Sequence, residues 1–162
     1  MIQELTETKC FYPLNKGVYY IYDDNIENKP LFLNKDERWN LNIVNNSEKI
    51  INFFQNDGCL MSQNELKKCD WLCFFENKFY FIEAKDVKIK KRNEERKDAI
   101  EKFEATIPYF SNLYPNIETM EIFVIMNFSS PKITNASHKL NETYFREKFN
   151  AKYKETNILE FN

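Results

Sequence analysis

Asp70, Glu83 and Lys85 are the charged residues of this chain whose types and spacing best suit joint chemistry. Two carboxylates can bind a hard cation, and a nearby ammonium can stabilise negative charge that develops in a reaction. Between the two acids lie two runs rich in aromatic and β-branched residues, 71–75 and 79–82, which flank a short polar tip. Such runs are typical of a β-hairpin, so the sequence predicts that a hairpin positions these charges.

The expected hairpin would bring the charges to one end of a sheet. With a two-residue loop, Glu76-Asn77, Asp70 lies directly opposite Glu83, with Cβ atoms roughly 5 Å apart on one face. Lys85 shares that face, whereas Ala84 points away. A three-residue loop would shift the register by one residue and would need a bulge near Asp70 to restore the meeting. Either loop predicts two carboxylates and an ammonium at one mouth of the sheet.

Both faces of the hairpin are apolar, as expected for the middle of a sheet that is covered on both sides. One face carries Leu72, Phe74, Phe79 and Phe81, and the other carries Trp71, Cys73, Phe75, Tyr80 and Ile82. Like charges at the end of such a strand repel each other and need compensation. A divalent cation supplies it, since Mg²⁺ binds one or two carboxylates together with waters and phosphate oxygens.

The spacing Asp70-x12-Glu83-x-Lys85 resembles the signature of the PD-(D/E)XK nuclease superfamily, the restriction-endonuclease-like fold. The resemblance covers residues 48 to 107 and departs from the pattern at Cys69, where the signature has proline. It implies an enzyme that hydrolyses phosphodiesters of nucleic acid, most often DNA, with Mg²⁺, for which Mn²⁺ can substitute. Asp70, Glu83 and the backbone carbonyl of Ala84 would be metal ligands. Lys85 would orient the attacking water or stabilise the charged phosphorane.

A third acidic ligand is also implied by the resemblance, because many members take one from a helix before the hairpin. We expect a helix over residues 46–57, with an apolar stripe of isoleucine and phenylalanine and with Gly58 as its stop. Glu48 lies in its first turn and is the candidate ligand, with Glu65 as its competitor. A favourable interaction of Glu48 with the helix dipole is the alternative.

A basic run begins three residues after Lys85. Six basic and three acidic residues lie between Lys88 and Asp98, and a helix is expected over residues 93–107, with Pro108 kinking or ending it. Beside a metal site, such a run would bind backbone phosphates and make binding sensitive to salt. The candidate nucleic-acid-binding residues are Lys88, Lys90, Lys91, Arg92, Arg96 and, facing the site by analogy with related nucleases, Lys102. The alternative is an ordinary solvated helix face.

The rest of the chain predicts a single α/β domain of 162 residues, in which a mixed central β-sheet has helices on both faces. Residues 1–44 form an N-terminal β-rich extension, and residues 45–162 form the nuclease-like, restriction-endonuclease-like core. The extension contains strands near 17–22 and 39–43. In the core, a buried strand near 122–126 follows the helix through a right-handed crossover and lies parallel to the second hairpin strand. A further helix ends near 149, and an edge strand covers 158–161.

Composition excludes several other classes of protein. With only two glycines the chain has no glycine-rich phosphate loop, and its net charge of −2 requires a local patch for any nucleic-acid binding. The absence of a long apolar run or secretory segment predicts a cytoplasmic protein without a membrane partner. Cys69 and Cys73 are expected in the core as small hydrophobes in a reducing compartment. A zinc site built from Cys59, Cys69, Cys73 and His138 is the alternative.

Two further functional hypotheses remain open at this stage. One is a catalytically inactive nuclease-fold protein that binds nucleic acid or protein, such as an immunity or inhibitor protein. The other is an unrelated α/β interaction protein in which the three charges form a surface ion cluster. Because many superfamily members cut two strands as dimers, the resemblance also implies a homodimer, with the aromatic N-terminal layer as the subunit contact.

Overall fold

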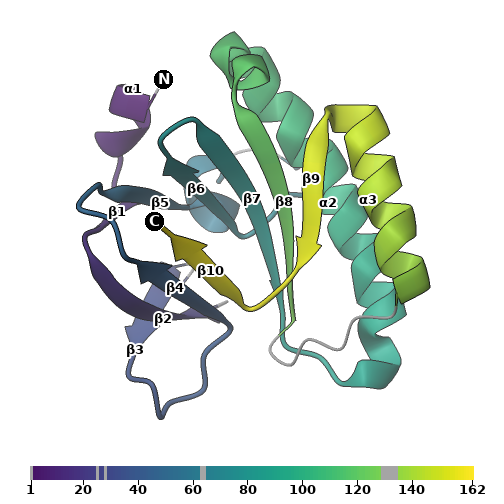
Figure 1. Cartoon of the computed structure of the whole chain (residues 1–162), viewed down its shortest axis with the longest axis horizontal. Coiled ribbons are helices and arrows are strands. Elements are labelled where there is room, and N and C mark those ends of the chain that lie inside the picture. The colour runs from purple at the N-terminus through teal and green to yellow at the C-terminus, as the bar shows by residue number, and fades with distance from the viewer. Residues whose placement is uncertain (1, 25, 28, 63–64, 129–134) are drawn as a thin grey trace.

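The computed structural model describes residues 2–162 apart from 25, 28, 63–64 and 129–134, and shows a mixed α/β fold with two sheets (Figure 1). Its helices are α1 (Ile2–Thr6), α2 (Arg92–Leu113) and α3 (Asn135–Phe149), with short turns η1 (Asn56–Leu60), η2 (Ile89–Lys91) and η3 (Pro115–Thr119). Its strands are β1 (Phe11–Leu14), β2 (Gly17–Asp24), β3 (Lys29–Leu33), β4 (Leu41–Asn45), β5 (Ile51–Gln55), β6 (Trp71–Phe75), β7 (Lys78–Lys85), β8 (Glu121–Phe128), β9 (Ala151–Glu155) and β10 (Ile158–Phe161).

The larger sheet has six strands in the order β1-β5-β6-β7-β8-β9. Strands β1, β5, β6 and β7 pair antiparallel, whereas β7, β8 and β9 pair parallel. The connection from β7 to β8 runs through α2, so the expected crossover between parallel strands is confirmed. The expected hairpin is β6–β7, which places the acids at the start of β6 and near the end of β7.

The smaller sheet has the order β10-β4-β2-β3, and β10 is the edge strand expected at the C-terminal end of the sequence. It pairs parallel with β4, although the two strands are far apart in the sequence. The predicted boundary between residues 44 and 45 falls inside β4, and β1 belongs to the larger sheet. The N-terminal residues are therefore interleaved with the rest of the chain in both sheets.

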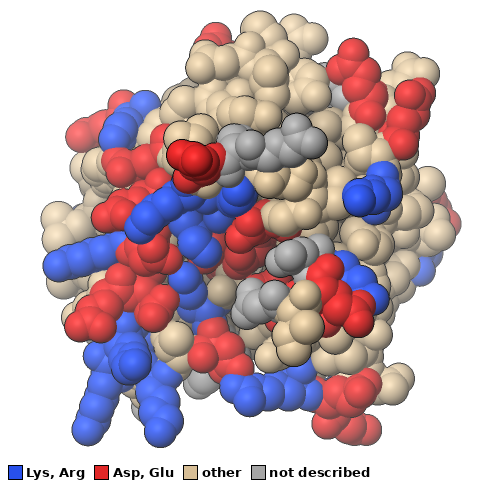
Figure 2. Space-filling view, turned by 180° about the vertical axis from the view of Figure 1, so that it is seen from behind, with Lys and Arg blue, Asp and Glu red and all other residues tan. Residues whose placement is uncertain are grey.

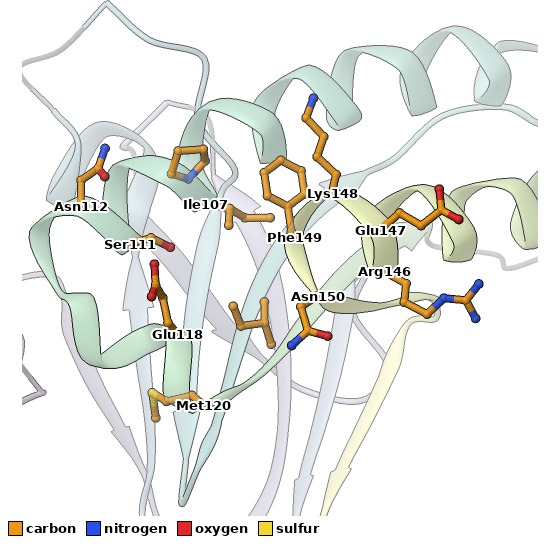
Figure 3. A pocket seen from close by; sticks show the side chains of 12 residues that line it. Ile107, Ser111, Asn112, Glu118, Met120, Arg146, Glu147, Lys148, Phe149 and Asn150 are labelled. Carbon is orange, nitrogen blue, oxygen red and sulfur yellow. The ribbon is translucent and has the colours of Figure 1, made fainter.

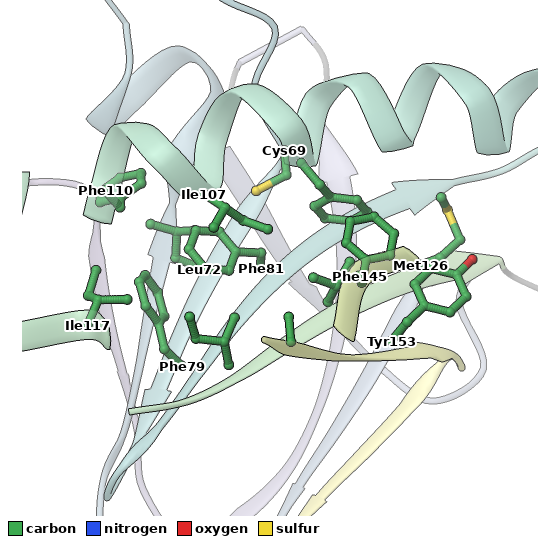
Figure 4. Close-up of a cluster of buried hydrophobic side chains, with 14 of the residues drawn as sticks. Cys69, Leu72, Phe79, Phe81, Ile107, Phe110, Ile117, Met126, Phe145 and Tyr153 are labelled. Atoms are coloured by element: carbon green, nitrogen blue, oxygen red, sulfur yellow. The ribbon is translucent and has the colours of Figure 1, made fainter. Parts of the chain in front are cut away.

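The larger sheet is covered by helices on one face and by the smaller sheet on the other (Figure 1). The prediction of helices on both faces is therefore wrong. The hairpin side chains divide between two cores, as the alternation predicted. The side that faces α2 and α3 carries Leu72, Phe79 and Phe81 (Figure 4), together with Phe74. The side that faces the smaller sheet carries Trp71, Cys73, Phe75, Tyr80 and Ile82. A sheet serves as well as a helix to cover an apolar face, and the hairpin sequence alone does not distinguish them.

Helix α2 is longer than predicted and contains Pro108 instead of ending there. Its buried stripe of Ala99, Phe103, Ile107 and Phe110 repeats at helical spacing and continues beyond the proline. Proline removes the N–H that would bond the carbonyl of Glu104, but the Pro108 ring is exposed. Burial of Phe110 explains why the helix continues for another turn despite that loss.

The helix predicted over residues 46–57 is absent, and β5 occupies most of that range. Phe53 faces the smaller sheet and Phe54 faces the helices, which is the alternation of a strand buried on both sides. A continuous apolar run fits a buried strand as well as a helix, and here pairing with β1 and β6 decides. Gly58, with φ of 70°, lies in the turn η1 instead of ending a helix.

Cys69 and Cys73 are buried free thiols, as expected, but the other two cysteines differ from the expectation of a reducing compartment. Cys10 and Cys59 form a disulfide that ties the segment before β1 to η1, whereas Cys69 and Cys73 are free and buried. Cys69 faces the helices and Cys73 faces the smaller sheet. With Cys59 bonded and the other two thiols on opposite faces, the alternative zinc site is not assembled. None of the described helices is both long and apolar enough to cross a bilayer.

Candidate active site

The β6–β7 hairpin brings Asp70 and Glu83 together. Trp71 pairs with Ile82, and Phe75 pairs with Lys78, so the loop is the two-residue Glu76-Asn77 and the next pair outward is Asp70 and Glu83. The backbone N–H of Ala84 donates to Asp70 Oδ2 at 2.7 Å. This bond fixes the Asp70 carboxylate against the end of β7, and both acids are buried.

The backbone before β6 is held by η1 and α2, which in turn fixes Asp70. Asn56 Nδ2 donates to the carbonyl of Cys69 at 2.8 Å, and the Asn56 N–H donates to the carbonyl of Asp70 at 2.8 Å. From the other side, the Cys69 N–H donates to Thr106 Oγ1 at 3.0 Å. Sequence reasoning missed Asn56 and Thr106 because neither belongs to a motif. Their role in positioning Asp70 follows only from their contacts in the structure with the backbone of Cys69 and Asp70.

Two lysines compensate the two acids. Lys102 Nζ on α2 lies 2.5 Å from Glu83 Oε1 and 3.8 Å from Asp70 Oδ1. Lys85 Nζ lies 3.1 Å from the same Glu83 Oε1 and also contacts two acids of α2, Asp98 at 3.0 Å and Glu95 at 3.2 Å. Lys102 thus faces the acids, as expected from the resemblance, and the cluster is a charge-paired network.

Burial sets the electrostatics of this cluster. The pKa of Glu83 is raised well above its ordinary value, first by burial and then by the negative charge of Asp70, and the two lysines only partly oppose this. Burial likewise raises the pKa of Asp70, against the attraction of Lys102 and the Ala84 N–H. Glu83 Oε2 is buried, and it has no hydrogen-bond partner among the described residues. A buried carboxylate oxygen without a partner is costly, so this oxygen could accept a ligand.

Asp23 is a third carboxylate near these acids, and it comes from the smaller sheet. It lies at the end of β2 and lines a cavity of about 60 Å³ together with Tyr22, Asn40, Ala84 and Asp86. Burial and then the charge of Asp70 raise its pKa to about 7. Sequence reasoning assigned no site residue to the first 44 positions. Only the packing of the two sheets reveals Asp23, since β2 is distant from the hairpin in sequence.

Glu48 and Glu65, the two candidates for a third ligand, do not join the acids. Glu48 precedes β5 at the loop end of the hairpin, where it pairs with Lys16 at 2.6 Å and its side chain is 85% exposed. The neighbouring Lys49 pairs with Glu76 in the hairpin loop. The assignment of Glu48 as a metal ligand is therefore wrong, because a strand replaces the helix that would have carried it. Glu65 is exposed in the segment before β6.

The predicted basic run divides into exposed and buried residues. Lys88, Lys90 and Lys91 are exposed around η2. Arg92 and Arg96 are buried with their guanidinium groups over the ring of Phe128, and Arg96 forms a two-pronged pair with Glu155 at 2.7 and 3.0 Å. Their assignment to a nucleic-acid surface is therefore wrong, because they stabilise the junction of α2 with β8 and β9. Figure 2 shows Lys and Arg intermixed with Asp and Glu on the side of the helices.

A separate cavity of about 500 Å³ lies between the end of α2, η3 and the end of α3 (Figure 3). Its lining mixes apolar residues such as Met120 and Phe149 with Glu118 and Arg146. None of Asp70, Glu83, Lys85 and Lys102 reaches it. This cavity is therefore distinct from the acid pair.

The donor set at the acid pair suits a hard cation. Across the part of the chain that the structure describes, no three His, Cys, Asp or Glu side chains are grouped to hold a metal ion. Mg²⁺ needs only one or two carboxylates, since waters and phosphate oxygens complete its shell, so Asp70 and Glu83 fit that requirement. In comparisons with known proteins, no family model, no curated protein and no solved structure matches this chain.

Proposed function

We propose that this protein is a divalent-cation-dependent phosphodiesterase that cleaves nucleic acid, with DNA as its substrate, and that it is related to the PD-(D/E)XK nucleases. The observation that carries the proposal is the acid pair itself. Asp70 and Glu83 are buried side by side at the mouth of the sheet, and none of the residues that the structure describes hydrogen-bonds to Glu83 Oε2. Such a pair is costly to bury in a merely structural role, whereas a cation site requires it.

Each residue of the cluster has a distinct role in this proposal. Asp70, fixed by the Ala84 N–H, and Glu83 would hold Mg²⁺ or Mn²⁺, with the Ala84 carbonyl as a backbone ligand. The cation would neutralise phosphate charge and make a nearby water easier to deprotonate. Lys85, held beside Glu83 by Glu95 and Asp98, would donate to the attacking water or to a phosphate oxygen.

The exposed lysines around η2 would bind the nucleic-acid backbone. Lys88, Lys90 and Lys91 follow the end of β7 directly, which places them beside the acid pair along the chain. The acidic side chains of the same surface give it little net field, so binding would depend on a few phosphate contacts. A homodimer, which the resemblance also implies, stays a prediction for sedimentation analysis to test.

Cleavage assays with isosteric variants test the proposal. Supercoiled and linear DNA, and single-stranded RNA, are incubated with the protein and Mg²⁺ or Mn²⁺. Asp70→Asn, Glu83→Gln and Lys85→Met should each lower the cleavage rate by about 100-fold or more. Glu121→Gln is the matched control, because Glu121 pairs with Lys152 at the opposite end of the sheet. Full activity in Asp70→Asn, or no cleavage by the wild type with either cation, would refute the proposal.

A binding protein that retains the fold without turnover is the second candidate. The observation in its favour is that Lys102 and Lys85 already compensate Glu83, and that Lys85 contacts three carboxylates. In that case the acids and lysines would form a fixed network that needs no cation. Salt-sensitive DNA binding without cleavage, unchanged by Asp70→Asn, would support this candidate over the enzyme.

A further inference from the structure

We infer that Lys102 is a resident counter-ion of the acid pair, and that its ammonium must leave Glu83 before a divalent cation can bind there. This inference rests on the proposed function and adds a regulating residue to the same site. Lys102 Nζ contacts Glu83 Oε1 at 2.5 Å and lies 3.8 Å from Asp70 Oδ1. It therefore takes the position between the two carboxylates that a shared cation would need.

The Lys102 ammonium and a divalent cation cannot both lie between the two carboxylates. A magnesium ion lies 2.0–2.1 Å from its carboxylate ligands, so an ammonium on the same oxygen would be only a few ångströms from it. Repulsion at such a distance is strong in a partly buried site. Binding of the cation through Oε2, the other Glu83 oxygen, would not remove this repulsion, because both oxygens belong to one carboxylate and the ammonium at Oε1 would still be close to the cation. Binding of the cation and withdrawal of Lys102 are therefore coupled.

Lys102 is better placed to leave than Lys85. Lys85 is anchored by two further carboxylates, Glu95 and Asp98, as well as by Glu83. Among the described residues, Lys102 forms ion pairs only with the acid pair. Its side chain is 20% exposed, so the ammonium has access to water while its backbone stays in α2. Of the two acids Lys85 contacts Glu83 alone, at 3.1 Å, so Glu95 and Asp98 would hold its ammonium aside while Lys102 exchanges with the cation.

Cation binding in the absence of nucleic acid tests this inference. Mg²⁺ and Mn²⁺ are titrated by calorimetry into the wild type, Lys102→Met, Lys102→Gln and Lys102→Arg, and folding is checked by circular dichroism. A neighbouring opposite charge changes the proton affinity of a carboxylate by about tenfold to a thousandfold. The Met and Gln variants should therefore bind the cation at least about tenfold more tightly, and the charge-retaining Arg variant should resemble the wild type.

Lys67→Met is the matched control. Lys67 lies on the same side of the molecule and pairs with Asp98 and Glu101, but it contacts neither acid. This variant should leave the cation affinity unchanged. Tighter binding by Lys102→Met even where the wild type binds no measurable cation would support the inference strongly.

The other outcomes separate the two proposals. Measurable binding with equal or weaker affinity in the Met and Gln variants would overturn the role of Lys102 and leave the proposed cation site intact. Absence of binding in every variant would overturn both.

Discussion

The two ends of the β6–β7 hairpin carry the same kinds of side chain in opposite environments. At the loop end, Glu76 pairs with Lys49 in solvent, and a hydrogen bond from that lysine lowers the pKa of Glu76. At the mouth, Glu83 pairs with two lysines but is fully buried, and its pKa is raised. Lysine partners alone therefore do not decide the electrostatics of a carboxylate. Burial and a neighbouring acid outweigh them.

The difference between these ends indicates where function is to be sought. Ion pairs at the loop end are exposed, and such pairs contribute little to stability. The pairs at the mouth are desolvated and are costly to break. Perturbed carboxylates of this kind concentrate at functional sites, although structural networks show them as well. If burial decides the difference, changes at the mouth should cost far more stability than matched changes at the loop end.

The largest effect is expected from the disulfide, which lies at the mouth. It joins Cys10 to Cys59 across a separation of 49 residues, so its loss should lower the free energy of unfolding by about 4 kcal/mol. Urea denaturation of the Cys10→Ser/Cys59→Ser double variant measures this loss. Wild type treated with a reductant should match the double variant, and the reductant should have no further effect on the double variant itself.

The disulfide also distinguishes the two ends of the hairpin. Cys59 belongs to η1, whose Asn56 bonds the backbone of Asp70. When the disulfide is removed, amide hydrogen exchange should therefore accelerate in η1 and at the start of β6 more than at the hairpin loop. Equal acceleration at both ends would show that η1 does not support the mouth specifically.

The next effect is expected from Lys102. Its replacement by Met leaves Glu83 and Asp70 buried with one positive charge fewer, and should lower the free energy of unfolding at pH 7 by about 3 kcal/mol. Lys49→Met is the counterpart at the loop end and should cause no measurable change, since Lys49 and Glu76 are solvated. Urea denaturation measures both. Equal costs for the two variants would mean that burial does not distinguish the ends.

The hairpin could be predicted from the sequence because it depends on residues that are close together in the chain. Strand alternation and a two-residue loop fix which side chains share a face, so Asp70 and Glu83 meet and the two apolar faces separate as expected. Helix α2 was foreseen for the same reason, because Ala99, Phe103 and Ile107 repeat at helical spacing. Only its end was misplaced, at Pro108.

What sequence reasoning missed depends on long-range packing. The apolar stretch of β5 resembles a helix until its pairing with β1 and β6 is known, and the error placed Glu48 at the wrong end of the sheet. Arg96 belongs to a basic run in the sequence. In the structure it is buried and paired with Glu155, which is distant in the sequence. Asp23 and Asn56 reach the acid pair only through the packing of other elements against the hairpin. No local pattern in the sequence records these contacts.

The smallest of the predicted effects concerns Asp23. Its replacement should raise the free energy of unfolding, whereas the changes at the disulfide and at Lys102 should lower it. Its pKa rises from 3.8 to about 7, so the folded protein binds more protons than the unfolded chain between those values. Stability from this group is therefore present at low pH and is lost as the pH rises from about 4 through about 7. Glu76 at the loop end should behave in reverse, because its lowered pKa favours the folded state above its ordinary value and loses that effect as the pH falls.

Asp23→Asn should remove the cost of burying this charge near Asp70. The full rise in pKa corresponds to about 4 kcal/mol, but Asp23 is only partly buried and solvent screens its charge, so at pH 8 the variant should be more stable than the wild type by about 2 kcal/mol, whereas at pH 4 the two should be similar. Urea denaturation across this pH range measures the difference, with Glu76→Gln as the counterpart that should gain nothing at pH 8. A wild-type profile that Asp23→Asn leaves unchanged would show that the smaller sheet does not share the electrostatics of the mouth. The acid pair would then belong to the hairpin and α2 alone.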